Sequence, residues 1–84
     1  IQGRPSVVMG EDVEFSNIAL PSTLEGKSLQ ASEIGEKTGL IVLAVDHDGK
    51  TEVSPGPEYL LKPGSRLNVL GTTEQLARFR ELFQ

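Results

Sequence analysis

The chain has 84 residues, enough for one domain at most, and it contains no cysteine, which excludes disulfides and thiolate metal sites. Its 12 acidic and 8 basic residues give a net charge of −4. The basic residues are scattered, whereas nucleic-acid binding needs clustered Lys and Arg that release counterions from phosphates, so we expect no nucleic-acid partner.

The first part of the chain predicts a linker followed by a strand. Residues 1–11 (IQGRPSVVMGE) show no hydrophobic period, so we interpret them as a linker or tail and residues 12–84 as the domain. Alternation of apolar and polar residues in 12–20 predicts a strand. Its larger apolar residues form two pairs of opposite parity: Val13 with Phe15, and Ile18 with Leu20. A bulge in the middle of the strand would bring both pairs to one face.

The middle of the chain predicts a short helix and a buried strand. The helix begins after Ser28 as N-cap and ends at Gly35, which suits a left-handed C-cap. Residues 36–39 follow as a turn, and residues 40–46 form a nearly continuous apolar run. Such a run is typical of a central strand covered on both faces. It is far shorter than the roughly 20 residues that span a bilayer.

The remaining elements complete a small sheet with a terminal helix. Asp48-Gly49 predicts a hairpin to a short strand at 50–53, and a Pro-Gly turn precedes a strand at 66–70. A helix at 74–83 carries an apolar stripe: Leu76, Phe79, Leu82 and Phe83. The fold class is therefore α+β: a mostly antiparallel sheet of about four strands, with a short helix and a C-terminal amphipathic helix packed on it.

No arrangement of residues in the sequence points to catalysis. His47 is the one histidine and lies between Asp46 and Asp48, where it could act as a metal ligand or general base. The same triplet is more typical of an exposed turn, where Asp is favoured for its backbone hydrogen bonds, and we favour that interpretation. Gly26-Lys27-Ser28 is not a phosphate loop, because Pro21 stands where the motif requires glycine. We therefore assign no catalytic residue, no metal ligand and no cofactor, and we expect a binding or assembly module and no enzyme.

Three segments, in order and with suitable spacing, carry a resemblance to a known family. They are residues 24–29 (LEGKSL), 36–45 (EKTGLIVLAV) and 61–72 (LKPGSRLNVLGT). Together they resemble the TrkA C-terminal domain, also called the RCK C-terminal domain, over roughly residues 13–83. The chain departs from the family at Ser65, where members commonly have Asp.

The resemblance implies a cytoplasmic regulatory domain of a potassium channel or of a potassium or other cation transporter, modulating ion transport. It also implies a homodimer, a membrane channel or transporter subunit as partner, and a small effector such as a cyclic dinucleotide or a cation. In members that bind cyclic di-AMP, the central strand and the segment after the hairpin take part. The matching positions here, in the cleft between protomers, are Val42, Leu43, Ser54 and Pro55.

Two other functions agree with the same residues. One is a pure dimerisation module without a ligand. The other is a small-ligand-binding module of another transporter or of a transcriptional regulator. Sequence flanking the chain would distinguish them, because transmembrane segments and a dinucleotide-binding motif would accompany the potassium-channel role.

Overall fold

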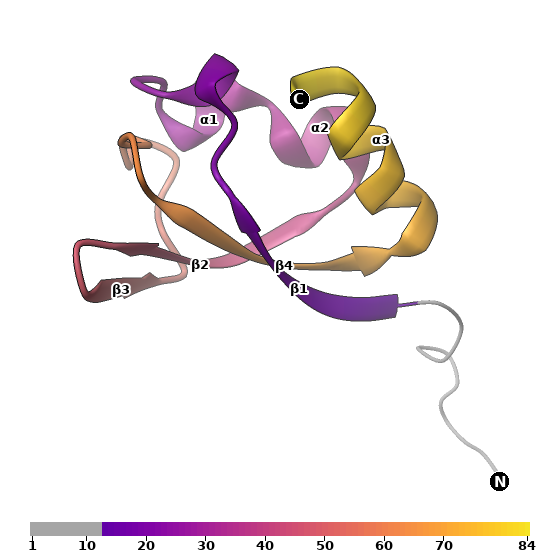
Figure 1. Ribbon diagram of the computed structural model, residues 1–84, viewed down its shortest axis with the longest axis horizontal. Coiled ribbons are helices and arrows are strands. Elements are labelled where there is room, and N and C mark those ends of the chain that lie inside the picture. The colour runs from indigo at the N-terminus through magenta and orange to yellow at the C-terminus, as the bar shows by residue number, and fades with distance from the viewer. Residues whose placement is uncertain (1–12) are drawn as a thin grey trace, which may run out of the picture.

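Four strands form one antiparallel sheet in the computed structural model, which describes residues 13–84 (Figure 1). The strands are β1 (Val13–Ala19), β2 (Ile41–His47), β3 (Lys50–Val53) and β4 (Arg66–Thr72). Their order in the sheet is β1-β4-β2-β3, and each neighbouring pair is antiparallel. The sheet and its helices confirm the predicted α+β class. The predicted linker at 1–11 lies outside the described residues.

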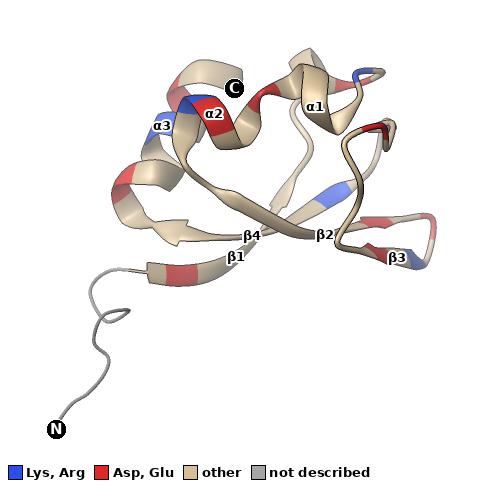
Figure 2. Cartoon of the chain, turned by 180° about the vertical axis from the view of Figure 1, so that it is seen from behind, with Lys and Arg blue, Asp and Glu red and all other residues tan. Residues whose placement is uncertain are grey.

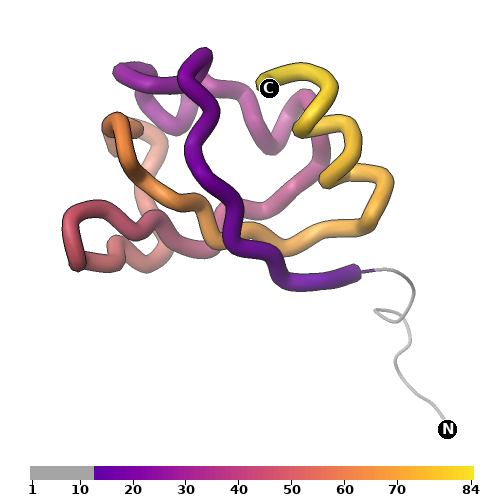
Figure 3. The backbone as a smooth tube through the Cα atoms, in the orientation of Figure 1, coloured from indigo at the N-terminus to yellow at the C-terminus, as the bar shows by residue number. Residues whose placement is uncertain are grey.

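The helices lie on one side of the sheet and leave the other side open (Figures 1 and 3). They are the 3-10 turn η2 (Ser22–Leu24), α1 (Leu29–Ser32), α2 (Ile34–Thr38) and α3 (Thr73–Phe83). We call the side of the sheet under the helices the covered face and the opposite side the open face. A single layer of helices can bury only one face, so the domain has one core.

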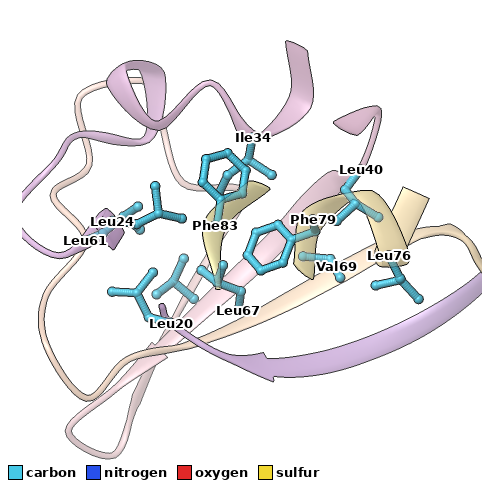
Figure 4. Packing of buried hydrophobic residues seen from close by; sticks show 11 residues of the cluster. Leu20, Leu24, Ile34, Leu40, Leu61, Leu67, Val69, Leu76, Phe79 and Phe83 are labelled. Carbon is cyan, nitrogen blue, oxygen red and sulfur yellow. The ribbon is translucent and has the colours of Figure 1, made fainter. Parts of the chain in front are cut away.

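Large apolar side chains of the covered face and of the helices form that core. Its buried members are Leu20, Leu24, Ile34, Leu40, Val45, Leu61, Leu67, Val69, Leu76, Phe79 and Phe83. In Figure 4 the rings of Phe79 and Phe83 project from α3 into this cluster, with ring centroids 5.1 Å apart. Leu82, predicted to pack with them, is 51% exposed. That prediction was wrong because six residues after Leu76 the helix has turned to the edge of its apolar stripe.

Strand β1 contains no bulge, contrary to the prediction. Its pairing with β4 runs without interruption from Val13–Thr72 to Ala19–Arg66. Ile18 therefore packs against the core, while Phe15 points to the open face and is 58% exposed. The irregularity lies instead in β2, where the register with β4 shifts between Val42 and Ala44.

The break between helices α1 and α2 falls at Glu33, two residues before the glycine that was expected to end the helix. Ser28 is the N-cap of α1 as predicted, and its hydroxyl accepts a 3.0 Å hydrogen bond from the Ala31 N–H. The left-handed residue after α1 is Glu33, with φ of 56°, and Gly35 lies inside α2. Residues 36–38 are helical, so the predicted turn is wrong; the glycine cap of α2 is Gly39, with φ of 85°.

Strand β2 is central in the sheet but is covered on one face only. Within residues 13–84, nothing covers Ile41, which is 56% exposed, so the prediction of two covered faces does not hold. The hairpin that follows is confirmed: Asp48 and Gly49 have φ of 55° and 79°, as a type I′ turn requires. The turn before β4 is also confirmed, with Gly64 at φ of 85°.

Candidate ligand-binding site

The four residues implied by the family resemblance lie around the first half of β2. Val42 points to the covered face and packs against the core. The Leu43 carbonyl accepts a 2.8 Å hydrogen bond from the Ser54 N–H, which joins the bulge of β2 to the end of β3. Ser54 has φ of 51°, and Pro55 follows it, half-buried. The structure therefore brings the four residues together at one edge of the sheet.

A pocket of about 360 Å³ lies beside this edge. Its walls come from the α1–α2 region, the start of β2 and the segment that follows β3. The lining residues are Leu29, Gln30, Glu33, Ile34, Gly35, Glu36, Leu40, Val42 and Pro57. Val42 is the one residue of the predicted four that lines it. We call this the β2 pocket.

The segment after β3 closes the β2 pocket because it is tied to α1. The Pro57 carbonyl accepts a 2.9 Å hydrogen bond from the Gln30 N–H, and the Tyr59 carbonyl accepts one of 2.8 Å from the Leu29 N–H. Leu61, two residues further on, is fully buried in the core. These bonds hold the wall in place without any regular element, which is why sequence patterns did not reveal it.

The first half of β2 has one unpaired edge. β3 pairs with β2 only from Ala44 to His47, and the Ser54 N–H bonds the Leu43 carbonyl, so within residues 13–84 only Ile41 and Val42 lack a neighbouring strand on that side. An unpaired strand edge presents backbone N–H and C=O groups that can bond a ligand or another strand. The β2 pocket and this edge together provide apolar walls and free backbone groups, which is the usual composition of a small-molecule site.

The charges around the β2 pocket are mainly negative. Glu33 and Glu36 line it, whereas no Lys or Arg of residues 13–84 does so. Glu33 forms an ion pair of 3.2 Å with Lys37, one turn later on α2, and both side chains are about half exposed. In Figure 2 this helix shows acidic and basic positions side by side. A surface pair of this kind adds little stability but partly neutralises one carboxylate.

The sequence profile of the TrkA-C domain matches residues 14–84, nearly the whole chain. The chain belongs to the TrkA-C domain family. It is 37% identical over 75 residues to potassium channel protein 1 of Methanocaldococcus jannaschii and 34% identical over 74 residues to probable potassium channel protein 2 of the same organism. These matches cover 88% and 86% of the chain but only 22% of each relative. The chain therefore corresponds to about a fifth of these channel proteins.

Solved structures give the same assignment. The RCK_C domain dimer of S. agalactiae BusR in complex with c-di-AMP superposes with a TM-score of 0.75 at 28% identity, covering 87% of this chain and 93% of that one. The GsuK channel bound to NAD superposes with a TM-score of 0.80 at 27% identity, covering 89% of this chain and 14% of that one. The family is one of regulatory domains of potassium channels and transporters, and it is not an enzyme family.

A further structure bears on the expected absence of a nucleic-acid partner. S. agalactiae BusR in complex with its busAB-promoter DNA matches with a TM-score of 0.71 at 28% identity, covering 86% of this chain and 35% of that one. A TrkA-C domain thus occurs in a protein that binds DNA. For this chain the absence of a nucleic-acid partner stays a prediction.

A second polar feature of the TrkA-C domain lies on its open face and ties the strands together. Asp46 on β2 accepts hydrogen bonds from Thr51 Oγ1 on β3 at 2.5 Å and from Asn68 Nδ2 on β4 at 3.0 Å. Asn17 on β1 donates to Asn68 Oδ1 at 2.6 Å and accepts from Arg66 Nε. The bond from Thr51, then the bond from Asn68, lowers the pKa of Asp46 below its ordinary value of 3.8. Because these polar side chains hydrogen-bond to one another across the four strands, this polar cluster helps to fix the register of the strands.

Within residues 13–84 the TrkA-C domain also has a second pocket of about 320 Å³, lined by polar residues of α2 and α3 and by Gly35 and Gly39. No group of three or more His, Asp or Glu side chains within residues 13–84 is arranged to hold a metal ion. His47 lies in the β2–β3 hairpin, on β2 opposite Lys50. No helix within the described residues is long and apolar enough to cross a membrane. Sequence reasoning missed every residue that lines the β2 pocket except Val42, including the polar Glu33 and Glu36, and the Pro-Gly-Pro run at 55–57 was a signal for Pro57 alone.

Proposed function

We propose that this TrkA-C domain pairs with a second copy, senses a small effector held in the β2 pocket at the cleft between the copies, and thereby modulates potassium ion transport. Val42 supplies an apolar wall, while Leu43, Ser54 and Pro55 form the adjoining rim. The effector biases the paired domains toward the arrangement that it binds better, which shifts the channel or transporter between states. The domain performs no catalysis and acts on the cytoplasmic side of the membrane.

The observation that carries this proposal is the position of the β2 pocket next to the unpaired half of β2. A pocket of about 360 Å³ falls in the range typical of small-molecule sites, about 300–1,000 Å³. Ile41 and Leu43, in this half of β2, are 56% and 37% exposed and favour contact with a second protein surface. The BusR domain, similar over almost its whole length, is a dimer in complex with its ligand, which supports the same arrangement here.

A chimeric channel tests the proposal. This chain replaces the matching segment of potassium channel protein 1 of M. jannaschii, and rubidium flux is measured in liposomes. Gln30→Trp places an indole at the β2 pocket from an exposed position on α1, and we expect it to change the flux. Ala31→Trp is the matched control, because Ala31 is the next exposed residue of α1 and does not line the pocket.

Equal flux from the two tryptophan variants and from the unmodified chimera would contradict the proposal. Circular dichroism of each isolated variant verifies that both still fold. A chimera that behaves like a channel lacking the segment altogether would also count against a regulatory role.

The likeness to BusR supports a second candidate, the effector-sensing domain of a DNA-binding regulator. The β2 pocket would serve it equally well, since only the domain that receives the signal differs. In that case the chimeric channel would not respond to Gln30→Trp. The same domain grafted in place of the RCK_C domain of BusR would instead restore effector-dependent DNA binding.

A further inference from the structure

The β2 pocket combines an apolar interior with an acidic rim. Five of its lining residues are apolar: Leu29, Ile34, Leu40, Val42 and Pro57. Its polar side chains are those of Gln30, Glu33 and Glu36. Such a lining fits a ligand that has an apolar body and a polar group at one end.

The two carboxylates of the rim are not equivalent. Glu33 is engaged by Lys37 at 3.2 Å, whereas Glu36 forms no ion pair with any residue of 13–84. Glu36 also lies in the first turn of α2. The net charge that a ligand meets at the rim is therefore negative, and Glu36 is the free carboxylate that carries it.

This charge disfavours phosphate-bearing effectors. Phosphate groups are bound by Arg, Lys or clustered backbone N–H groups, and no Arg or Lys within 13–84 lines the pocket. If the pocket lies at a two-fold cleft between copies, each carboxylate occurs twice, which doubles the repulsion. A metal ion alone would not use the apolar walls, and the described residues hold no cluster of ligands for one.

We propose that the β2 pocket binds a small organic cation, whose apolar body packs on Leu40 and Val42 and whose ammonium or guanidinium group meets Glu36. This inference rests on the proposed effector role of the pocket and names the class of effector. The ammonium group forms a charge-assisted hydrogen bond, and the apolar body leaves water on entering the pocket.

Three indole compounds of similar size test the charge preference: tryptamine is a cation, tryptophol is neutral and indole-3-acetate is an anion at pH 7. Their affinities for the 84-residue chain are measured by amide chemical-shift titration at low salt. We expect tryptamine to bind about tenfold more tightly than indole-3-acetate, with tryptophol between them. The shifted amides should include those of Gly35, Leu40 and Val42.

Two variants that each remove one carboxylate test whether Glu36 causes the preference for a cation. Glu36→Gln should bring the affinities of tryptamine and indole-3-acetate close together while leaving that of tryptophol unchanged. Glu81→Gln removes the same charge from an exposed position on α3 that does not line the pocket, and it should preserve the order.

The proposal is overturned if indole-3-acetate or a cyclic dinucleotide binds more tightly than tryptamine, if none of the three indoles binds, or if Glu36→Gln behaves like Glu81→Gln. These results would leave the proposed effector role standing if the chimeric channel still responds to Gln30→Trp. If the chimeric channel does not respond to Gln30→Trp but the β2 pocket still binds tryptamine most tightly, the proposed regulatory role would be wrong and the proposed class of ligand would stand.

Discussion

The two faces of the sheet carry similar apolar side chains but differ in what covers them. On the covered face Val45, Leu67 and Val69 are completely buried beneath the helices. On the open face Phe15 is 58% and Val53 is 71% exposed. Alternation along a strand therefore identifies which residues share a face, and packing of the helices decides which of the two faces becomes the core.

The largest expected effect is a difference in stability between two variants, one that truncates a phenylalanine of the core and one that truncates a phenylalanine of the open face. Phe79→Ala removes a fully buried ring at the centre of the core and should lower the free energy of unfolding by about 3–5 kcal/mol. Phe15→Ala on the open face should change it by no more than about 0.5 kcal/mol in a monomer. Urea denaturation of both variants checks this. Similar losses from the two substitutions would mean that Phe15 is also covered.

A glycine within β4 tests how closely the covered face is packed. A methyl group at Gly71 would come closer than 3.0 Å to Leu40 Cδ2 and to Gln75 Oε1. Because Leu40 is buried, Gly71→Ala should lower stability by about 1–3 kcal/mol through overpacking. Gly56→Ala is the control, since a methyl group there meets no atom within 4 Å. Equal thermal midpoints for the two variants would refute the close packing.

The start of α3 depends on a capping box where β4 ends. The Thr72 hydroxyl accepts from the Gln75 N–H at 3.1 Å, and the Gln75 side chain accepts from the Thr72 N–H at 2.9 Å. Thr72→Ala should lower the free energy of unfolding by about 1 kcal/mol. Thr72→Ser should lower it much less, because serine keeps the capping hydroxyl. If Ser and Ala variants unfold at the same urea concentration, the cap contributes nothing.

The smallest expected effect concerns the polar cluster of the open face and acid stability. Since the pKa of Asp46 is lowered by folding, its contribution to stability is present above pH 3.8 and is lost as the pH falls through the lowered value. Asp46→Asn should therefore lose less stability than the wild type on acidification below about pH 4. The control is Asp48→Asn, because Asn tolerates the left-handed conformation of the hairpin. Parallel profiles of melting temperature against pH for all three proteins would contradict the cluster's role.

Sequence reasoning predicted the strands, the hairpin and the terminal helix because each depends on neighbours along the chain. It failed where distant contacts decide the outcome. The faces of Phe15 and Ile18 depend on an unbroken register with β4, and the bulge at Leu43 depends on two strands at once. The break between α1 and α2 falls at Glu33, a residue type that rarely adopts positive φ, so no local signal marked it.

Only Val42 of the four residues expected at the ligand site lines the β2 pocket, and the role of all four in binding stays a prediction. Family resemblance led to Val42, Leu43, Ser54 and Pro55, which the fold does gather at one edge of the sheet. The pocket beside them was not predictable, because its walls come from α1, α2 and the irregular segment at Pro57. Hydrogen bonds between Pro57 and Gln30 and between Tyr59 and Leu29 place that segment, and they link residues about thirty positions apart.

Pairing of two copies is the central claim of this account, because the cleft, the doubled carboxylates and the shift between channel states all require it. Multi-angle light scattering of the 84-residue chain at high micromolar concentration tests it most directly. The account predicts a mass of twice 9.1 kDa, whereas a single copy of 9.1 kDa at that concentration would contradict it.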